Sequence, residues 1–230
     1  MINGGVINII KAVIFDLDGT LLDRDQSVIQ FIDNQYQRYH ERLNHIPKDT
    51  YIRRFIELDT RGYVSKEKVY QTLVKEFKNT NLTCEALLQD YRTQFKHHCI
   101  PFPNLHSVLE GLHNKNLRLG LISNGKGQFQ MDNVEVLGIK EYFDTILISE
   151  WEGMKKPDPK IFQKALHQLN VQSNKSLFVG DHPEKDIQGA QNIGMISVWK
   201  RDDYWKNTKA EYIIENLQDL LSVLEELNKG

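Results

Sequence analysis

The chain has 230 residues, which is long for one compact unit and short for two independent domains, so a main domain carrying an insertion is favoured. Hydrophobic residues make up 40% and charged residues 26%, as in ordinary folded proteins, and this excludes a largely disordered chain. The formal net charge of −2 provides no broad basic field for nucleic acid or an anionic membrane, so we expect a small-molecule partner instead.

Neither the cysteines nor the N-terminal segment indicates export. Cys84 and Cys99 lack the spacing of a disulfide framework or a metal site, so a reducing compartment is expected. Asn3, Asn8 and Lys11 interrupt the apolar N-terminal residues, and no cleavage-site pattern follows, which predicts no signal peptide. No segment approaches the ~18 consecutive apolar residues of a membrane span. We therefore expect a cytoplasmic protein.

The first predicted element is a buried strand over residues 12–15, Ala-Val-Ile-Phe. After Leu22 the apolar residues recur at helical spacing, and four stripes without a strand predict a separate helical unit. The stripes are Val28, Phe31, Ile32 and Tyr36; Tyr51, Ile52, Phe55 and Ile56; Val69, Leu73 and Phe77; and Leu87, Tyr91 and Phe95. Pro101 and Pro103 end this region, because proline cannot continue a helix and disfavours helical geometry in the residue before it.

Strands and helices alternate beyond these prolines. The predicted strands cover residues 117–123, 142–149, 176–180, 195–199 and 212–214. The predicted helices end near residue 137, begin after Pro159, cover 183–192 and close the chain over 217–227. This alternation predicts an α/β core with a Rossmann-like, doubly wound parallel sheet.

Two carboxylates follow the first strand, in the run Asp16-Leu17-Asp18-Gly19-Thr20. Residues i and i+2 of a strand point to the same side, and the carboxyl ends of strands face the ligand crevice of such a sheet. Two like charges this close repel, so the pair predicts a bound divalent metal, separate acid and nucleophile roles, or both. Ordinary Asp-Gly turn chemistry with solvated acids is the alternative.

Two later segments offer groups that suit a phosphate. Ser123 and Asn124 end the strand at 117–123, where their donors suit a phosphate oxygen, although a plain helix cap explains the same residues. Lys156 precedes a proline, and a lysine held by this stiff segment would offset the charge of an incoming phosphate. The neighbouring Lys155 is expected to be solvated.

A further strand end supplies more carboxylates. Asp181 follows the strand at 176–180, and Asp186 lies five residues later. Mg²⁺ prefers octahedral oxygen coordination, and Asp16, Asp181 and the backbone carbonyl of Asp18 would provide its protein ligands. Asp186 lies at the start of a predicted helix, where capping is one explanation. We favour a role for Asp186 in orienting water, the metal or the lysine.

In chain order these segments resemble the motifs of the haloacid dehalogenase superfamily of phosphohydrolases. They are DLDGT at 16–20, SNG at 123–125, KPDP at 156–159 and GDHPEKD at 180–186. The resemblance implies a core domain of residues 1–21 and 98–230, with a type-one helical cap domain inserted over 22–97. His182 departs from the pattern, in which a small residue is usual at that position, and we assign it no role.

The resemblance also implies a role for each site residue. Asp16 would attack phosphorus to form an aspartyl-phosphate, and Asp18 would act first as general acid and then as general base. Mg²⁺ would bridge Asp16, Asp181 and the phosphoryl group, while Lys156 would counter the phosphate charge. The phosphate oxygens would be held by Thr20, Ser123 and Asn124.

A phosphatase acting on a sugar phosphate, a nucleotide or a similar small ester is the expected function. Halide displacement is disfavoured, because family members that displace halide lack an acid at the position of Asp18. A phosphomutase would share all the core residues. A non-catalytic phosphate-binding module would tolerate loss of Asp16, Asp18 or Lys156, but all three are present. The sequence leaves open whether the protein is a monomer or a homodimer.

The helical insertion is where substrate selection is expected, since a cap that closes over the site would contact the leaving group. Arg53, Arg54 and Arg61 lie in this insertion near Gly62, and they are candidates for binding the distal part of the substrate. Solvated surface charge is the alternative explanation for all three arginines.

Overall fold

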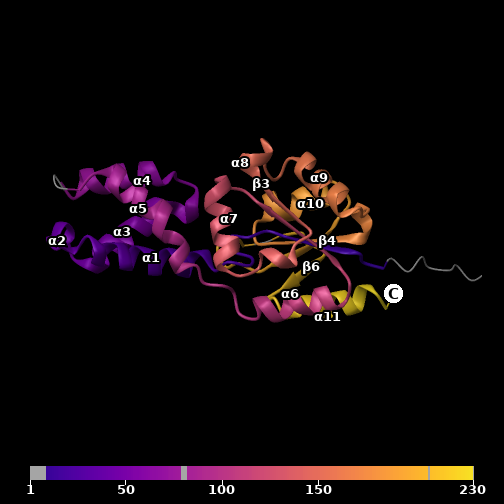
Figure 1. Ribbon diagram of the computed structural model, residues 1–230. Coiled ribbons are helices and arrows are strands. Elements are labelled where there is room, and N and C mark those ends of the chain that lie inside the picture. Colours follow the sequence, from indigo (N-terminus) through magenta and orange to yellow (C-terminus); the bar gives the residue numbers. More distant parts are fainter. Residues whose placement is uncertain (1–8, 79–81, 207, 230) are drawn as a thin grey trace, which may run out of the picture. The chain divides into compact units, whose positions relative to one another are not determined.

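The computed structural model describes residues 9–78, 82–206 and 208–229 (Figure 1). The chain forms two compact units. One comprises the chain up to Asp23 and from Pro101 onward, and the other comprises Arg24–Ile100. None of the helices in the described residues combines the length and the apolar character needed to cross a bilayer.

The first unit is built on a six-stranded parallel sheet in the order β3-β2-β1-β4-β5-β6. The strands are β1 (Ala12–Phe15), β2 (Arg118–Ser123), β3 (Thr145–Ile148), β4 (Ser176–Gly180), β5 (Ile196–Lys200) and β6 (Tyr212–Ile214). The central strands β1 and β4 are buried along their whole length, as expected where helices cover both faces. The strand order reverses between β1 and β4, and such switch points are where ligands bind in open α/β sheets.

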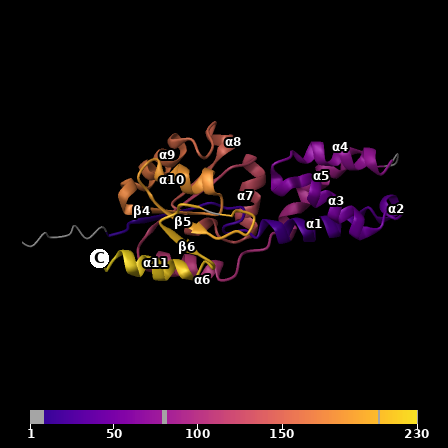
Figure 2. The ribbon, with the colours of Figure 1, turned by 180° about the vertical axis from the view of Figure 1, so that it is seen from behind.

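Helices cover both faces of this sheet (Figures 1 and 2). On one face lie α9 (Pro159–Leu169) and α10 (Gly189–Gln191), and on the other lie α6 (Leu105–Asn114) and α11 (Asp219–Leu227). Phe162 of α9 packs on Phe178 of β4 in a buried cluster, with the ring centroids 5.1 Å apart. Two more helices, α7 (Gly127–Val136) and α8 (Ser149–Glu152), follow β2 and β3.

The second unit is helical. Its helices are α1 (Arg24–Arg38), α2 (His40–Leu43), α3 (Lys48–Asp59), α4 (Lys66–Glu76) and α5 (Cys84–Gln94), with 3₁₀ turns at Thr60–Gly62 and Phe95–His98. Aromatic side chains form much of its core. The rings of Phe31 and Tyr91 lie 5.2 Å apart, and those of Phe55 and Tyr70 lie 5.5 Å apart.

The predicted α/β class, parallel sheet and helical insertion are confirmed, and two predicted elements are corrected. The strand expected over 142–149 is only β3, because Ser149 already begins α8. The helix expected over 183–192 is instead a π-helical turn, η5 (Pro183–Gln188), followed by the short α10. Widened turns of this kind occur often at functional sites, and η5 carries the buried Asp186.

The buried face of α3 also differs from the predicted stripe. Tyr51 and Phe55 are buried as expected, but Ile56 is 41% exposed. The next buried position is Asp59, whose carboxylate lies 2.7 Å from the Arg24 guanidinium and also pairs with Lys66. An acid can occupy this interior position because two cations neutralise it.

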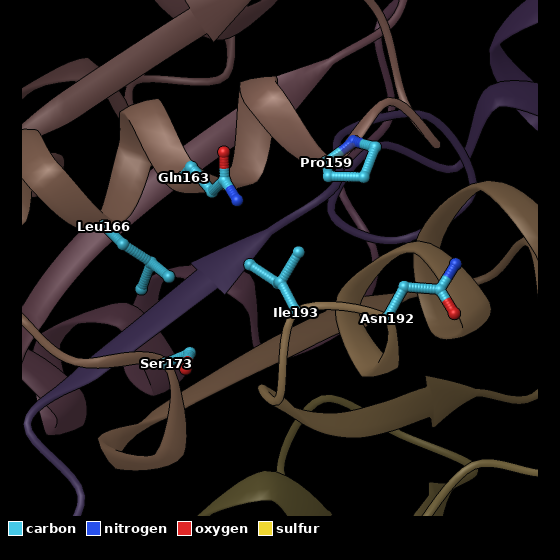
Figure 3. Close-up of a pocket in the computed structure, with 6 residues that line it drawn as sticks. All are labelled: Pro159, Gln163, Leu166, Ser173, Asn192 and Ile193. Atoms are coloured by element: carbon cyan, nitrogen blue, oxygen red, sulfur yellow. The ribbon is translucent and has the colours of Figure 1, made fainter.

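A cavity of about 380 Å³ opens beside α9 in the first unit (Figure 3). It is lined by Pro159, Gln163, Leu166, Ser173, Asn192 and Ile193. None of these side chains is ionisable, and of the motif residues only Pro159, the last residue of KPDP, lines the cavity. The cavity therefore does not have the charge that a phosphate or metal site requires.

The ion pairs of Asp59 predict a pH-dependent contribution to stability. Burial alone would raise the pKa of Asp59, but Arg24 and Lys66 together lower it. A carboxylate whose pKa is lowered by folding stabilises the fold above its unfolded-state pKa of about 4, and loses this effect as the pH falls through the folded-state pKa. Asp59→Asn should therefore reduce the free energy of unfolding by about 3 kcal/mol at neutral pH and by less in acid.

Urea unfolding followed by circular dichroism measures this difference. Asp33→Asn is the matched control, because Asp33 pairs with Lys48 in the same unit while the two side chains are 36% and 39% exposed. Loss of an exposed pair should cost under about 1 kcal/mol. Equal losses from the two variants at neutral pH would contradict a stabilising role for the buried pair.

Candidate active site

The carboxyl ends of the central strands bring the predicted motif residues to one edge of the sheet. Phe15 of β1 pairs with Leu121 of β2 on one side and with Val179 of β4 on the other. The Asp16 N–H then donates to the carbonyl of Val179 at 2.9 Å. The segments after β1, β2 and β4 therefore meet, as the spacing of the motifs predicts.

Lys156 is the centre of this site. Its side chain is 2% exposed, and its Nζ lies 2.5 Å from Oδ1 of Asp16 and 2.7 Å from Oδ1 of Asp186. A buried ammonium requires such partners, since removing it from water is otherwise very unfavourable. The lysine predicted to face the first carboxylate therefore does so, and it also contacts Asp186.

The backbone of Lys156 is fixed by the SNG segment. Asn124 Nδ2 donates to the carbonyl of Lys156, and the Lys156 N–H donates back to Oδ1 of Asn124, both at 2.9 Å. This reciprocal pair couples the loop after β2 to the loop before α9. It supports a role for Asn124 in placing the lysine, while contact of Asn124 with phosphate stays a prediction.

Three carboxylates converge beside the ammonium. Asp16, Asp181 and Asp186 each offer one carboxylate oxygen, and the three oxygens lie within 4.8 Å of one another. Gly19 allows this approach: its φ is +87°, and a Cβ there would lie 2.6 Å from Oδ2 of Asp181. A side chain at position 19 would thus be strained and would displace Asp181.

Burial and repulsion between the carboxylates raise the pKa values of Asp16 and Asp181. Burial raises the pKa of Asp16 to about 7, with Lys156 opposing the shift and Asp186 adding to it. Burial, followed by repulsion from Asp16 and Asp186, raises the pKa of Asp181 well above its ordinary value. Burial would lower the pKa of Lys156, but Asp16 and Asp186 outweigh it and keep the ammonium charged. Lys156 thus pairs directly with Asp16 and Asp186, and the ammonium of Lys185 lies near enough to interact electrostatically with all three carboxylates.

This donor set fits a hard divalent cation. Carboxylate oxygens are the ligands that Mg²⁺ prefers, and a cation among them would relieve their mutual repulsion. Asp16, Asp181 and Asp186 therefore form a candidate metal site. From the sequence, Asp186 was expected to orient water, the metal or the lysine rather than to bind the metal itself. Its carboxylate oxygen lies close enough to those of Asp16 and Asp181 to be a metal ligand as well.

Asp18 has different neighbours from Asp16. Its Oδ2 accepts a 2.6 Å hydrogen bond from Nε2 of Gln130, and the same nitrogen donates to Oγ of Ser123 at 2.5 Å. Thr20 instead contacts Asp16, with its Oγ1 donating to Oδ2 at 3.3 Å. Gln130 could not be predicted from the sequence, because a glutamine among the polar positions of a helix gives no signal of its own.

His182, the residue that departs from the family pattern, lies at the start of the turn after β4 and caps that turn. His182 Nδ1 accepts from the N–H groups of Glu184 and Lys185 at 3.2 Å, so its ring caps η5. The His182 N–H in turn donates to Oδ2 of Asp186 at 3.0 Å. His182 therefore holds the turn that carries Asp186.

The arginines of the helical unit have partners of their own. Arg54 contacts the carboxylate of Glu76 at 2.7 Å and that of Glu57 at 3.0 Å. Arg61 lies 3.2 Å from Asp25, and Arg53 is exposed. Substrate binding by these arginines stays a prediction.

Known proteins share the sequence pattern that forms this site. The pattern of the haloacid dehalogenase-like hydrolases matches residues 13–200, a range that contains every motif described above. The chain belongs to this family. A glyceraldehyde 3-phosphate phosphatase from Pyrococcus abyssi is 32% identical over 230 residues, covering 95% of both chains.

Solved structures of haloacid dehalogenase-like (HAD) proteins share the fold. A HAD phosphatase from Thermococcus onnurineus is 28% identical with a TM-score of 0.66, covering 94% of this chain and 98% of that chain. The magnesium-bound HAD-hydrolase YfnB from Bacillus subtilis has a TM-score of 0.73 at 23% identity, covering 94% and 99%.

A cation at the HAD carboxylate cluster should stabilise the protein. Mg²⁺ at 100 times its Kd should add about 2.7 kcal/mol to the free energy of unfolding and raise the Tm. Asp181→Asn should weaken this response, because the cluster loses one charged ligand. Without metal the same variant should be at least as stable as the unchanged chain, because one repulsive charge is gone.

Thermal unfolding with Mg²⁺ or with a chelator measures both effects. Asp203→Asn removes the same charge from an exposed position and serves as the control, so its response to Mg²⁺ should match that of the unchanged chain. A Tm of the unchanged protein that does not respond to Mg²⁺ would count against the metal site.

Proposed function

We propose that the protein is a Mg²⁺-dependent phosphatase that hydrolyses a small-molecule phosphomonoester through an aspartyl-phosphate on Asp16. The observation that carries this proposal is the buried contact of Asp16 with Lys156, beside the carboxylates of Asp181 and Asp186. The Pyrococcus abyssi relative is named a glyceraldehyde 3-phosphate phosphatase, which supports this class of substrate.

Asp16 is the proposed nucleophile of the first half-reaction. Its carboxylate oxygen attacks phosphorus, and the bond between phosphorus and the ester oxygen breaks. Asp18 gives its proton to the leaving oxygen, which departs as an alcohol. Lys156 keeps a positive charge beside Asp16, which favours the ionised carboxylate that the attack requires.

Water completes the reaction in the second half. Asp18, now ionised, accepts a proton from water as the water oxygen attacks phosphorus. The bond between phosphorus and Asp16 breaks, which frees the carboxylate and releases inorganic phosphate. One positioned acid thus serves both half-reactions and ends in its starting state.

Charge on the phosphoryl group is countered by residues around Asp16. Asp16, Asp181 and the backbone carbonyl of Asp18 would hold Mg²⁺, with Asp186 adjacent to them, and the bound ion would neutralise phosphoryl oxygens. Lys156 would add a second positive charge. The remaining phosphate contacts are proposed for Thr20, Ser123 and Asn124.

The helical insertion, residues 22–97, is the proposed cap that selects among esters. Arg54 is its first candidate for contact with the distal part of the substrate. Because Arg54 already pairs with Glu57 and Glu76, substrate would have to compete with those carboxylates. An unchanged order of substrate preference in Arg54→Ala would refute this role.

Asp16→Asn should abolish phosphate release, because an amide is a poor nucleophile and cannot form the aspartyl-phosphate. We expect a loss in kcat of at least ~1,000-fold. Phosphate release is measured with Mg²⁺ or with a chelator on a panel containing glyceraldehyde 3-phosphate, a nucleoside monophosphate, a hexose phosphate and p-nitrophenyl phosphate. Asp203→Asn is the control and should keep full activity.

The same panel of esters distinguishes a phosphatase from the two alternative functions. A hexose phosphate that isomerises without releasing phosphate would indicate a phosphomutase. Mg²⁺ binding without turnover of any ester would favour a non-catalytic phosphate-binding module. Substantial phosphate release by Asp16→Asn would rule out Asp16 as the nucleophile.

A further inference from the structure

A buried glutamine connects Asp18 to the end of β2. Gln130 lies on α7 and is 2% exposed. Its Nε2 donates to Oδ2 of Asp18 at 2.6 Å and to Oγ of Ser123 at 2.5 Å. Its Oε1 accepts from Nδ2 of the fully buried Asn133 at 3.2 Å. Both ends of the amide are therefore engaged.

These neighbours fix which way the amide points. A carboxylate only accepts hydrogen bonds, so a reversed amide would place Oε1 against the Asp18 oxygen and the two acceptors would repel. Asn133 presents a donor on the opposite side and matches Oε1 there. Gln130 is thus held as a donor toward Asp18.

The SNG segment leaves room for this glutamine. A Cβ at position 125 would lie 2.7 Å from Cγ of Gln130, which is closer than real side chains approach. Gly125 therefore lets α7 bring Gln130 against the turn after β2. The close packing of Gly125, Ser123 and Gln130 restricts where the donor can lie.

Asp18 needs an external constraint because it is only partly buried and lies just beyond the end of β1. Its side chain rotates about two bonds, and proton transfer requires one orientation within hydrogen-bond reach of the ester oxygen. The bond from Gln130 occupies Oδ2. Proton exchange with the substrate would then fall to Oδ1.

We propose that Gln130 is a positioning residue that holds the Asp18 carboxyl group in the orientation for proton transfer. This inference rests on the phosphatase function proposed above. In the first half-reaction the proton passes from Oδ1 of Asp18 to the ester oxygen as its bond to phosphorus breaks. In the second, Oδ1 takes a proton from the attacking water, and Gln130 neither gains nor loses a proton.

Two esters that differ in how much their leaving groups need a proton can test this role of Gln130. An alkoxide leaves poorly without a proton, whereas p-nitrophenolate leaves without one. Gln130→Met keeps the length of the side chain and removes its amide, so the loss should depend on the ester. We expect kcat/KM to fall by roughly 10–100-fold for glyceraldehyde 3-phosphate and by less than about 3-fold for p-nitrophenyl phosphate.

Two further variants isolate the contact with Asp18. Gln128→Met is the matched control, because Gln128 is exposed on the same helix and donates to Asp132, and both esters should react as in the unchanged chain. Ser123→Ala removes the other partner of the Gln130 donor. It should lower kcat/KM for both esters by similar factors, since Ser123 is a proposed phosphate contact.

Equal losses on the two esters in Gln130→Met, or no loss on glyceraldehyde 3-phosphate, would overturn the proposal. If that variant does not fold, Gln130→Glu provides the same comparison, because a carboxylate of equal length repels Asp18 and should produce the same dependence on the leaving group.

A crystal structure of the folded variant provides a readout that needs no turnover. Displacement of the Asp18 carboxylate from its position in the unchanged protein would support positioning by Gln130. An unmoved carboxylate would overturn it. If the unchanged protein hydrolyses neither ester, the phosphatase proposal fails, while this comparison still decides whether Gln130 positions Asp18.

Discussion

The candidate site depends on one buried ammonium. Lys156 lies between Asp16 and Asp186, and each of the three charges would be very unfavourable in the interior without the others. The backbone of Lys156 is fixed as well, because the Asn124 side chain forms hydrogen bonds with both its N–H and its carbonyl group. The ends of β1 and β2, the turn after β4 and the loop before α9 must therefore assemble together for the charges to be satisfied.

The parallel sheet brings these segments close, but side-chain volume decides whether they can meet. The register of β1 with β2 and β4 aligns the strand ends. Gly19 then admits Asp181, and Gly125 admits Gln130, at distances that a Cβ would not allow. The glycines of the first two motifs therefore do more than shape their own turns. By lacking a Cβ, they leave space for side chains from other segments of the chain.

The strand-end chemistry could be predicted from the sequence because apolar runs followed by acids or amides mark both the strand and its exposed end. Contacts in the interior of the protein could not be predicted in this way. Ile56 fits a helical stripe but is exposed, whereas Asp59 is buried and is neutralised there by two cations. Gln130 is indistinguishable by pattern from Gln128, and only tertiary packing places one against Asp18 and the other at the surface.

The same limit applies to the turn after β4. Its composition favours a helix, yet the chain forms a π-helical turn there. The wide turn lets the Asp186 carboxylate accept from the N–H of His182 while it pairs with Lys156. Contacts with a lysine thirty residues away in the sequence cannot be read from local periodicity, which reports only which faces are apolar.

The two carboxylates of the first motif, although two residues apart, have different partners. Asp16 is buried and contacts an ammonium, whereas Asp18 is half-buried and contacts a neutral amide. An ammonium favours an ionised carboxylate, which a nucleophile requires. A neutral amide can hold one carboxyl oxygen while the other carries or loses a proton, which an acid and base requires. The two carboxylates, whose close spacing implies repulsion, are thus stabilised by different partners. Asp16 is paired with Lys156 from the loop before α9, and Asp18 is held by Gln130 from α7.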